Sequence, residues 1–176
     1  LPILLGIAHQ GMTENFRMNR LLMWIQPENY SSGIGYQTVQ GLYAIGSGGL
    51  FGKGLGKSLQ KLGFIPESQN DMIFSIICEE LGLFGAMCII LVFALMLWRI
   101  IHIAQNAPDL FGTMLAAGVF AHVAVQVVLN IAVVTNFIPN TGVSLPFISY
   151  GGTASFFLLL EMGIVLNISS KIRLER

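Results

Sequence analysis

Mostly apolar stretches, each long enough to cross a lipid bilayer as a helix, recur three times along the chain. They cover residues 72–98, 111–134 and 147–168, and the third is interrupted only by Glu161. A helix needs about 20 mostly apolar residues to span the hydrocarbon core. The pattern therefore predicts an all-α fold, a polytopic membrane helix bundle with three complete transmembrane helices.

The segments between these stretches predict how the chain is placed in the membrane. Residues 1–8 are apolar but too short to span, so we interpret them as the end of a transmembrane helix whose beginning is missing. Residues 9–71 form one large loop, and residues 169–176 form a charged tail. Short cytoplasmic loops carry an excess of Lys and Arg, whereas loops beyond about 60 residues translocate largely regardless of charge. The charges of the short Arg99 loop and of the tail therefore predict a cytoplasmic C-terminus and an extracytoplasmic large loop.

Composition agrees with a membrane protein and excludes one class of partner. The chain is 54% hydrophobic and 10% charged, whereas soluble domains carry about 25% charged residues. Its formal net charge is zero, which argues against binding of nucleic acid.

The large loop combines glycines with spaced lysines. This part contains Gly52, Lys53, Gly54, Gly56, Lys57 and Lys61. The pattern disfavours a nucleotide-binding P-loop, because Phe51 stands where that motif needs a glycine. Two interpretations stay open. Backbone N–H and ammonium groups could hold a phosphate, or the segment is a flexible basic turn that faces lipid headgroups.

Acidic residues mark the beginning of the first complete helix. Asp71 stands at its outer end, where it either caps the helix or belongs to a polar stripe that lines a cavity. Glu79 and Glu80 follow about 12 Å further along a continuous helix, and Glu79 is on the Asp71 side. A carboxylate inside the membrane is by default a functional candidate or one half of a buried pair.

Polar residues also align on one face of the second helix. His122, Gln126 and Asn130 follow at intervals of four, a pattern that favours interhelical hydrogen bonds over catalysis. A metal site at His122 is excluded, because no second His or Cys lies at helical spacing. The helical rise places His122 about 15 Å and Glu161 about 9 Å from the cytoplasmic ends of their helices. We therefore predict that Glu161 faces the bundle and hydrogen-bonds His122 or another polar group, as a structural element.

Several motifs, in one order, resemble the C-terminal half of the SEDS family of FtsW, RodA and SpoVE membrane glycosyltransferases. They are Gly35–Gln37, Ala44–Lys61, Pro66–Glu67 with Asp71, Glu79–Gly82, Asn130 and Leu145–Gly152. The Ser58–Lys61 run is nearest the FtsW and SpoVE branch. Two positions depart from the family pattern, Asn70-Asp71-Met72 and Thr153-Ala154, and both changes preserve rough size.

The resemblance implies a ten-helix protein of the bacterial cytoplasmic (inner) membrane, in which this chain is part of one integral-membrane domain. It implies polymerisation of lipid II from an undecaprenyl-pyrophosphate donor, in cell division or sporulation, with Asp71 as the catalytic base. The implied substrate-binding residues are Lys53, Lys57, Lys61, Gly52, Gly54, Gly56, Glu67, Ser149 and Tyr150. Glu79, Glu80, His122, Gln126, Asn130 and Glu161 are interpreted as structural polar residues.

The implied partners are a class B penicillin-binding protein transpeptidase and other division or sporulation proteins. A divalent cation would suit the pyrophosphate, but no ligand cluster in the sequence marks one. Two other functions stay open, a lipid II transporter and a non-catalytic septal scaffold. The crowding of the motifs at the outer surface favours chemistry there over transport.

Overall fold

The computed structural model describes residues 24–25, 34–58 and 70–172. Its four long helices are α2 (Ile34–Gly48), α3 (Ile73–Gln105), α4 (Leu110–Val134) and α5 (Gly152–Lys171). No strand occurs within these described ranges, and the predicted all-α fold is confirmed. The predicted helix end at residues 1–8 lies outside the described residues.

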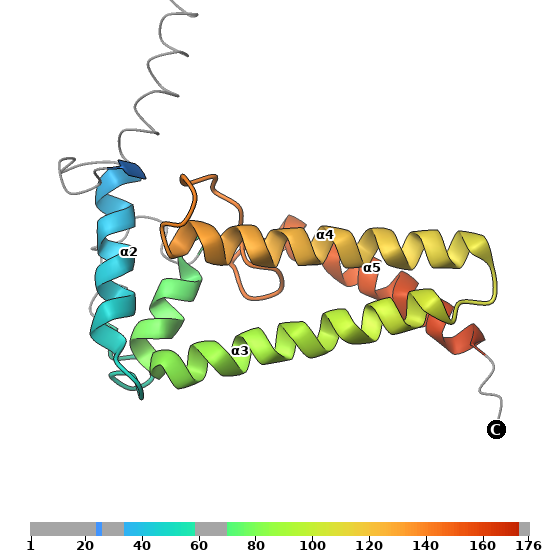
Figure 1. The fold of residues 1–176 in the computed structure, drawn as a ribbon, viewed down its shortest axis with the longest axis horizontal. Coiled ribbons are helices and arrows are strands. Elements are labelled where there is room, and N and C mark those ends of the chain that lie inside the picture. The colour runs from blue at the N-terminus through green and yellow to red at the C-terminus, as the bar shows by residue number, and fades with distance from the viewer. Residues whose placement is uncertain (1–23, 26–33, 59–69, 173–176) are drawn as a thin grey trace, which may run out of the picture.

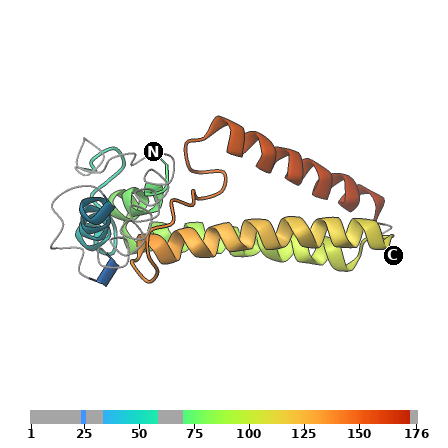
Figure 2. The same cartoon turned by 90° about the horizontal axis from the view of Figure 1, so that it is seen from above.

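Two of the helices run side by side, and a third crosses their end. In Figure 1, α3 and α4 lie together over most of their length, joined by a short turn after Gln105. Figure 2 shows that α5 leans away from this pair at its beginning and approaches it at its C-terminal end. Helix α2 lies across the end of the bundle at which α3 begins and α4 ends.

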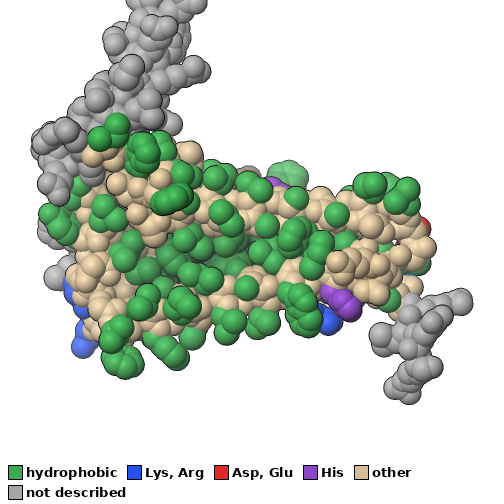
Figure 3. Space-filling model, viewed as in Figure 1, with side chains coloured by type: hydrophobic (Ala, Val, Ile, Leu, Met, Phe, Trp, Pro, Cys, Tyr) green, Lys and Arg blue, Asp and Glu red, His purple; other side chains and the backbone are tan. Residues whose placement is uncertain are grey.

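The three long helices carry apolar side chains on their outer faces. Helices α3, α4 and α5 are each long and apolar enough to cross a membrane. Large side chains such as Leu91, Trp98 and Phe157 are exposed, and Figure 3 shows hydrophobic side chains along the visible face of the bundle. A soluble protein would not expose apolar surface of this extent, so the fold is that of a multi-pass membrane protein.

The two largest differences between the predicted and the observed helix boundaries lie at the end of the first helix and at the beginning of the third. The first transmembrane helix continues past Trp98 to Gln105, because Arg99 and His102 are compatible with a helix and Pro108 is the first residue that is not. The third begins at Gly152 and not at residue 147. Phe147 has a φ of +63°, which a regular helix does not allow. The chain therefore turns before α5.

Helix α3 is broken at Gly82, which has φ 69° and ψ −168°. Before this residue the helix runs beside α2, and after it the helix turns and runs along α4 (Figure 1). The prediction of one continuous helix through residues 72–98 is therefore wrong at Gly82. Glu79 and Glu80 lie before the break, in the part of α3 that runs beside α2 (Figure 1).

Candidate functional site

The segment after α2, residues 49–58, is called the glycine loop below, and its backbone pairs with the break in α3. Four hydrogen bonds between backbone groups join the two. They are Lys53 N to Glu79 O at 2.9 Å, Gly54 N to Glu80 O at 2.9 Å, Leu83 N to Gly49 O at 2.9 Å and Phe84 N to Leu50 O at 3.1 Å. A broken helix leaves carbonyls and amides without intrahelical partners, and lipid offers none. The glycine loop supplies them.

This pairing explains why glycine stands at three positions. A Cβ added at Gly52 would lie 2.2 Å from the Glu80 carbonyl oxygen, and one at Gly48 would lie 2.0 Å from that of Cys78. A Cβ at Gly82 would lie 2.3 Å from the Gly52 nitrogen. Real side chains do not tolerate such distances, so the two backbones can approach only where the Cβ is absent.

The backbone hydrogen bonds of the glycine loop determine whether its amides are available to a ligand. The N–H groups of Gly52, Lys53 and Gly54 donate to carbonyls within the protein. They are therefore engaged by α2 and α3, and the predicted backbone cradle for a phosphate is not formed by these three groups. Substrate binding by the side chains of the loop stays a prediction.

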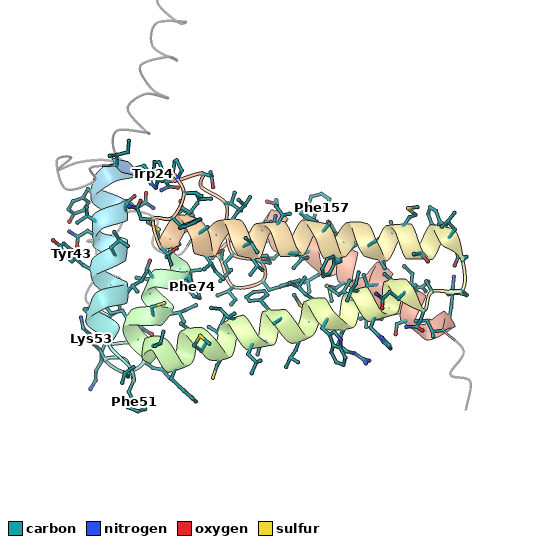
Figure 4. The ribbon with its side chains drawn as sticks, in the orientation of Figure 1. Trp24, Tyr43, Phe51, Lys53, Phe74 and Phe157 are labelled. Carbon is teal, nitrogen blue, oxygen red and sulfur yellow. The ribbon has the colours of Figure 1, made fainter. Side chains whose placement is uncertain are left out.

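Glu79 lies beneath the glycine loop and is completely buried. Its carboxylate accepts a hydrogen bond from Lys53 Nζ at 2.7 Å and another from the Ser58 hydroxyl. Ser47 Oγ, at the end of α2, lies 3.4 Å away. In Figure 4, Lys53 stands where α2, the loop and α3 meet. Lys53 is thus the counter-ion of a buried carboxylate, and Glu79 is one half of a buried pair, as one of the two interpretations had it.

The other predicted residues of this region have different surroundings. The Lys57 side chain is exposed, and Gly56 has no atom within 4 Å of an added Cβ. Glu80 has a buried Oε1 with no hydrogen-bond partner among the described residues. Lys61 and Glu67 lie outside the described residues.

Asp71 lies in the turn just before α3 and is half-buried. Its Oδ1 accepts a hydrogen bond from Gln37 Nε2 of α2 at 3.2 Å. Its backbone carbonyl accepts one from Asn130 Nδ2 of α4 at 2.8 Å. The N-cap residue of α3 is Met72, so the structure ties Asp71 to α2 and α4 and places it one residue before the cap.

Gln37 is a site residue that the sequence interpretation did not select. It begins a stripe of small residues on α2, and Gly41, Ala44 and Gly48 continue this stripe and are buried. The signal that could have identified Gln37 is its position: it is a polar residue in line with the small residues through which α2 packs on another helix. Its amide donates a hydrogen bond to the carboxylate of Asp71.

Within the described residues, the polar face of α4 makes one hydrogen bond to another helix, from His122 to Glu161 of α5. His122 Nδ1 lies 2.9 Å from Glu161 Oε2, which confirms the predicted pairing. Gln126 Nε2 lies 3.0 Å from His122 Nε2, so the imidazole fits the tautomer that donates from Nδ1 and accepts at Nε2. Asn130 lies on the same face near the end of α4 and is fully buried.

Ser149 and Tyr150, the predicted substrate contacts before α5, differ in exposure. The Ser149 hydroxyl accepts a hydrogen bond from the Leu145 amide at 2.7 Å, which closes the turn that contains Pro146. The Tyr150 side chain is exposed. A cavity of about 470 Å³ at the opposite end of the bundle, between Pro108 and Lys171, contains none of the predicted site residues.

Metal binding finds no support in the described part of the chain. No group of three or more His, Cys, Asp or Glu side chains there could hold a metal ion. The divalent cation that would suit a pyrophosphate stays a prediction.

Known proteins match the chain over nearly its whole length. The family model described as "Cell cycle protein" (FtsW/RodA/SpoVE) matches residues 2–174. Stage V sporulation protein E of Bacillus subtilis is 46% identical over 164 residues, which are 93% of this chain and 45% of that protein. The probable peptidoglycan glycosyltransferase FtsW of Trichlorobacter lovleyi is 44% identical over 159 residues, 90% of this chain and 42% of that protein. The chain thus spans less than half the length of these relatives.

Two solved structures share the fold. One, described as "Structural coordination of polymerization and crosslinking by a peptidoglycan synthase complex", has a chain that matches with a TM-score of 0.70 at 23% identity, over 91% of this chain and 43% of that one. A mutant of the Thermus thermophilus rod shape determining protein RodA matches with a TM-score of 0.58 at 30% identity, over 77% of this chain and 41% of that one. The family model, the similar relatives and the shared fold all indicate one family. The chain belongs to the FtsW/RodA/SpoVE family of membrane proteins.

Proposed function

We propose that the protein that contains this chain polymerises lipid II into glycan strands of peptidoglycan, with Asp71 as the general base. The observation that carries the proposal is the setting of Asp71. Its carboxylate is held by Gln37 and its backbone by Asn130, at the end of the bundle where the family motifs gather. The names of the relatives, which include peptidoglycan glycosyltransferases, support the same activity.

The chemistry needs one base and a stabilised leaving group. The Asp71 carboxylate takes the proton of the acceptor sugar hydroxyl as that oxygen bonds to the anomeric carbon of the donor. The bond from this carbon to the pyrophosphate oxygen breaks, and its electron pair stays with the undecaprenyl pyrophosphate. A single displacement of this kind inverts the anomeric centre. A positioned base contributes about 10²–10⁴-fold, so other groups must stabilise the charge that develops on the pyrophosphate.

The lysines of the glycine loop divide between two tasks in this proposal. Lys53 is already paired with Glu79 at 2.7 Å, so most of its charge is compensated inside the protein. Lys57 is exposed at the same end of the bundle and is the described loop cation that remains for the pyrophosphate.

The cellular setting follows from the same proposal. The protein acts at the outer face of the bacterial cytoplasmic membrane, in division or sporulation, with its C-terminus in the cytoplasm. A class B penicillin-binding protein that crosslinks the new strands is the expected partner. The structural neighbour from a peptidoglycan synthase complex, in which polymerisation and crosslinking are coordinated, supports such a partnership.

The test uses purified full-length protein with its penicillin-binding partner and labelled lipid II. We expect glycan ladders from the unaltered protein and none from Asp71→Asn, which keeps the shape of the side chain and removes the base. The matched control is Asp109→Asn, because Asp109 caps α4 by accepting from Gly112 N at 3.0 Å and Asn caps helices equally well.

If the Asp71→Asn protein is present at normal abundance and makes glycan strands as long as those of the unaltered protein, Asp71 has a structural role and is not the base. If the unaltered protein moves lipid II across the membrane of vesicles and makes no glycan ladder, the alternative function of a lipid II transporter is favoured.

A further inference from the structure

Asn130 is the buried polar side chain that joins three segments at the outer end of the bundle. It lies near the end of α4 and has no exposed surface. Its Nδ2 donates to the carbonyl of Asp71 at 2.8 Å and to the carbonyl of Val143 at 2.7 Å. These acceptors lie 59 and 13 residues away in the sequence, before α3 and in the loop between α4 and α5.

The two contacts define both the orientation and the identity of the side chain. Both neighbours of this atom are carbonyl oxygens, which only accept, so the atom must be the amide nitrogen with its two protons. An aspartate of the same shape would present an acceptor to two acceptors. A leucine of similar volume would donate to neither carbonyl. Among residues of this size, asparagine is the one that supplies two donors from a single atom.

The two carbonyls belong to backbone outside the helices. Asp71 lies in the turn before α3, and Val143 follows Gly142, which has a φ of +71°. Backbone in such turns lacks the regular partners of a helix, so a side chain from a neighbouring helix can fix its position. Asn130 thereby holds the backbone of Asp71 against α4, while Gln37 of α2 holds its carboxylate.

Stability alone does not account for this residue. The Oδ1 of Asn130 is buried and has no hydrogen-bond partner among the described residues. An unpaired buried acceptor is unfavourable for folding, which offsets part of what the two hydrogen bonds contribute. Loss of the amide would also leave the carbonyls of Asp71 and Val143 without this donor, so the test below separates folding from the direct effect on the place of Asp71.

We propose that Asn130 is a positioning residue for the base, which places the Asp71 carboxylate against the acceptor hydroxyl through the backbone of Asp71. The proposal rests on the proposed function, because it assigns Asn130 to the same site. A displacement of about 1 Å can cost about 10²-fold in rate. Loss of the amide should therefore lower kcat and leave the binding of lipid II unchanged.

The test compares Asn130→Leu with the unaltered full-length protein, in complex with its penicillin-binding partner, on labelled lipid II. We expect kcat to fall about 10- to 100-fold, with KM for lipid II within about twofold. Asn130→Asp should lose as much, since it keeps the shape and reverses the polarity. Gln126→Leu is the matched control, because Gln126 lies one turn earlier on the same face and its amide contacts His122. It should keep kcat within about twofold, because its amide bonds to a residue of the same helix, and side-chain pairs one turn apart on a helix contribute little.

Each alternative result has a definite meaning. If the unaltered complex makes no polymer, the proposed function itself is wrong. An active unaltered complex with an unchanged kcat in Asn130→Leu overturns the positioning role alone. A kcat that returns to normal once rates are divided by the amount of folded, lipid II-binding protein also overturns it, because the loss was then one of folding. An equal loss in Gln126→Leu overturns it too, since the effect would belong to the whole polar face of α4.

Discussion

Removal of Lys53 should destabilise the protein through the carboxylate that it leaves behind. Glu79 has no exposed surface, and Lys53 Nζ lies 2.7 Å from its Oε1. Lys53→Met keeps the length of the apolar stem and removes the charge. Breaking a buried ion pair by removal of one partner costs about 3–5 kcal/mol. Because one third of the Lys53 side chain is exposed (33%), the lower end, about 3 kcal/mol, is expected.

The double variant separates the charge from the shape of the site. In Lys53→Met with Glu79→Gln, neither partner of this ion pair is charged, and the neutral amide still contacts the Ser58 and Ser47 hydroxyls. Replacement of both partners of a buried pair is often close to neutral. We therefore expect the double variant to recover most of the stability that Lys53→Met loses, to within about 1 kcal/mol of the unaltered protein.

The measurement is the free energy of unfolding of the full-length protein in mixed micelles, with Lys57→Met as the control. Lys57 lies in the same loop and is exposed, so its loss should change the free energy of unfolding by less than about 1 kcal/mol. Equal stability of Lys53→Met and Lys57→Met would refute the reasoning. Lys53 would then be free to bind the pyrophosphate, as the sequence interpretation had it.

Four further variants test the glycine loop and the contact between Glu161 and the polar face of α4. Gly52→Ala should abolish normal membrane abundance, because its Cβ would lie 2.2 Å from the Glu80 carbonyl. Gly56→Ala, at a φ of +75° but with no atom within 4 Å, should lose only about 1 kcal/mol; equal abundance of the two variants would contradict the close approach. Glu161→Gln should keep glycan polymerisation, and Glu161→Leu should lower the free energy of unfolding by about 0.6 kcal/mol, the average for such bonds. An inactive Glu161→Gln at normal abundance would assign Glu161 to the chemistry.

The features that sequence predicted well depend on length and on the cost of burying charge. An apolar stretch of about 20 residues or more is stable as a helix in lipid, so the three membrane-spanning helices were predictable from the length and apolar character of each stretch. The pairing of Glu161 with His122 was predictable because an isolated carboxylate at that depth is unfavourable. Neither inference requires knowledge of how distant segments meet.

The features that sequence did not predict depend on contacts between distant segments. Helix α2 contains Gly41, Gly46 and Gly48, which disfavour a helix in isolation, and burial of Gly41 and Gly48 against its neighbours decides its structure. The break at Gly82 is stable because the carbonyls of Gly49 and Leu50 accept from the amides that follow it. No local pattern around Gly82 shows that these partners exist.

The glycine loop and the break in α3 therefore require each other. Gly52 must lack a Cβ because the Glu80 carbonyl lies against it, and Gly82 must lack one because the backbone of Gly52 lies against it. This mutual requirement explains glycines that the sequence alone left open between a phosphate cradle and a flexible turn. It fixes the loop to the end of the bundle, with the charge of Lys53 directed inward to Glu79. Asp71 lies at the same end of the bundle, in the turn before α3. Gln37 of α2 donates to its carboxylate and Asn130 of α4 donates to its backbone carbonyl, and we therefore propose that catalysis takes place there.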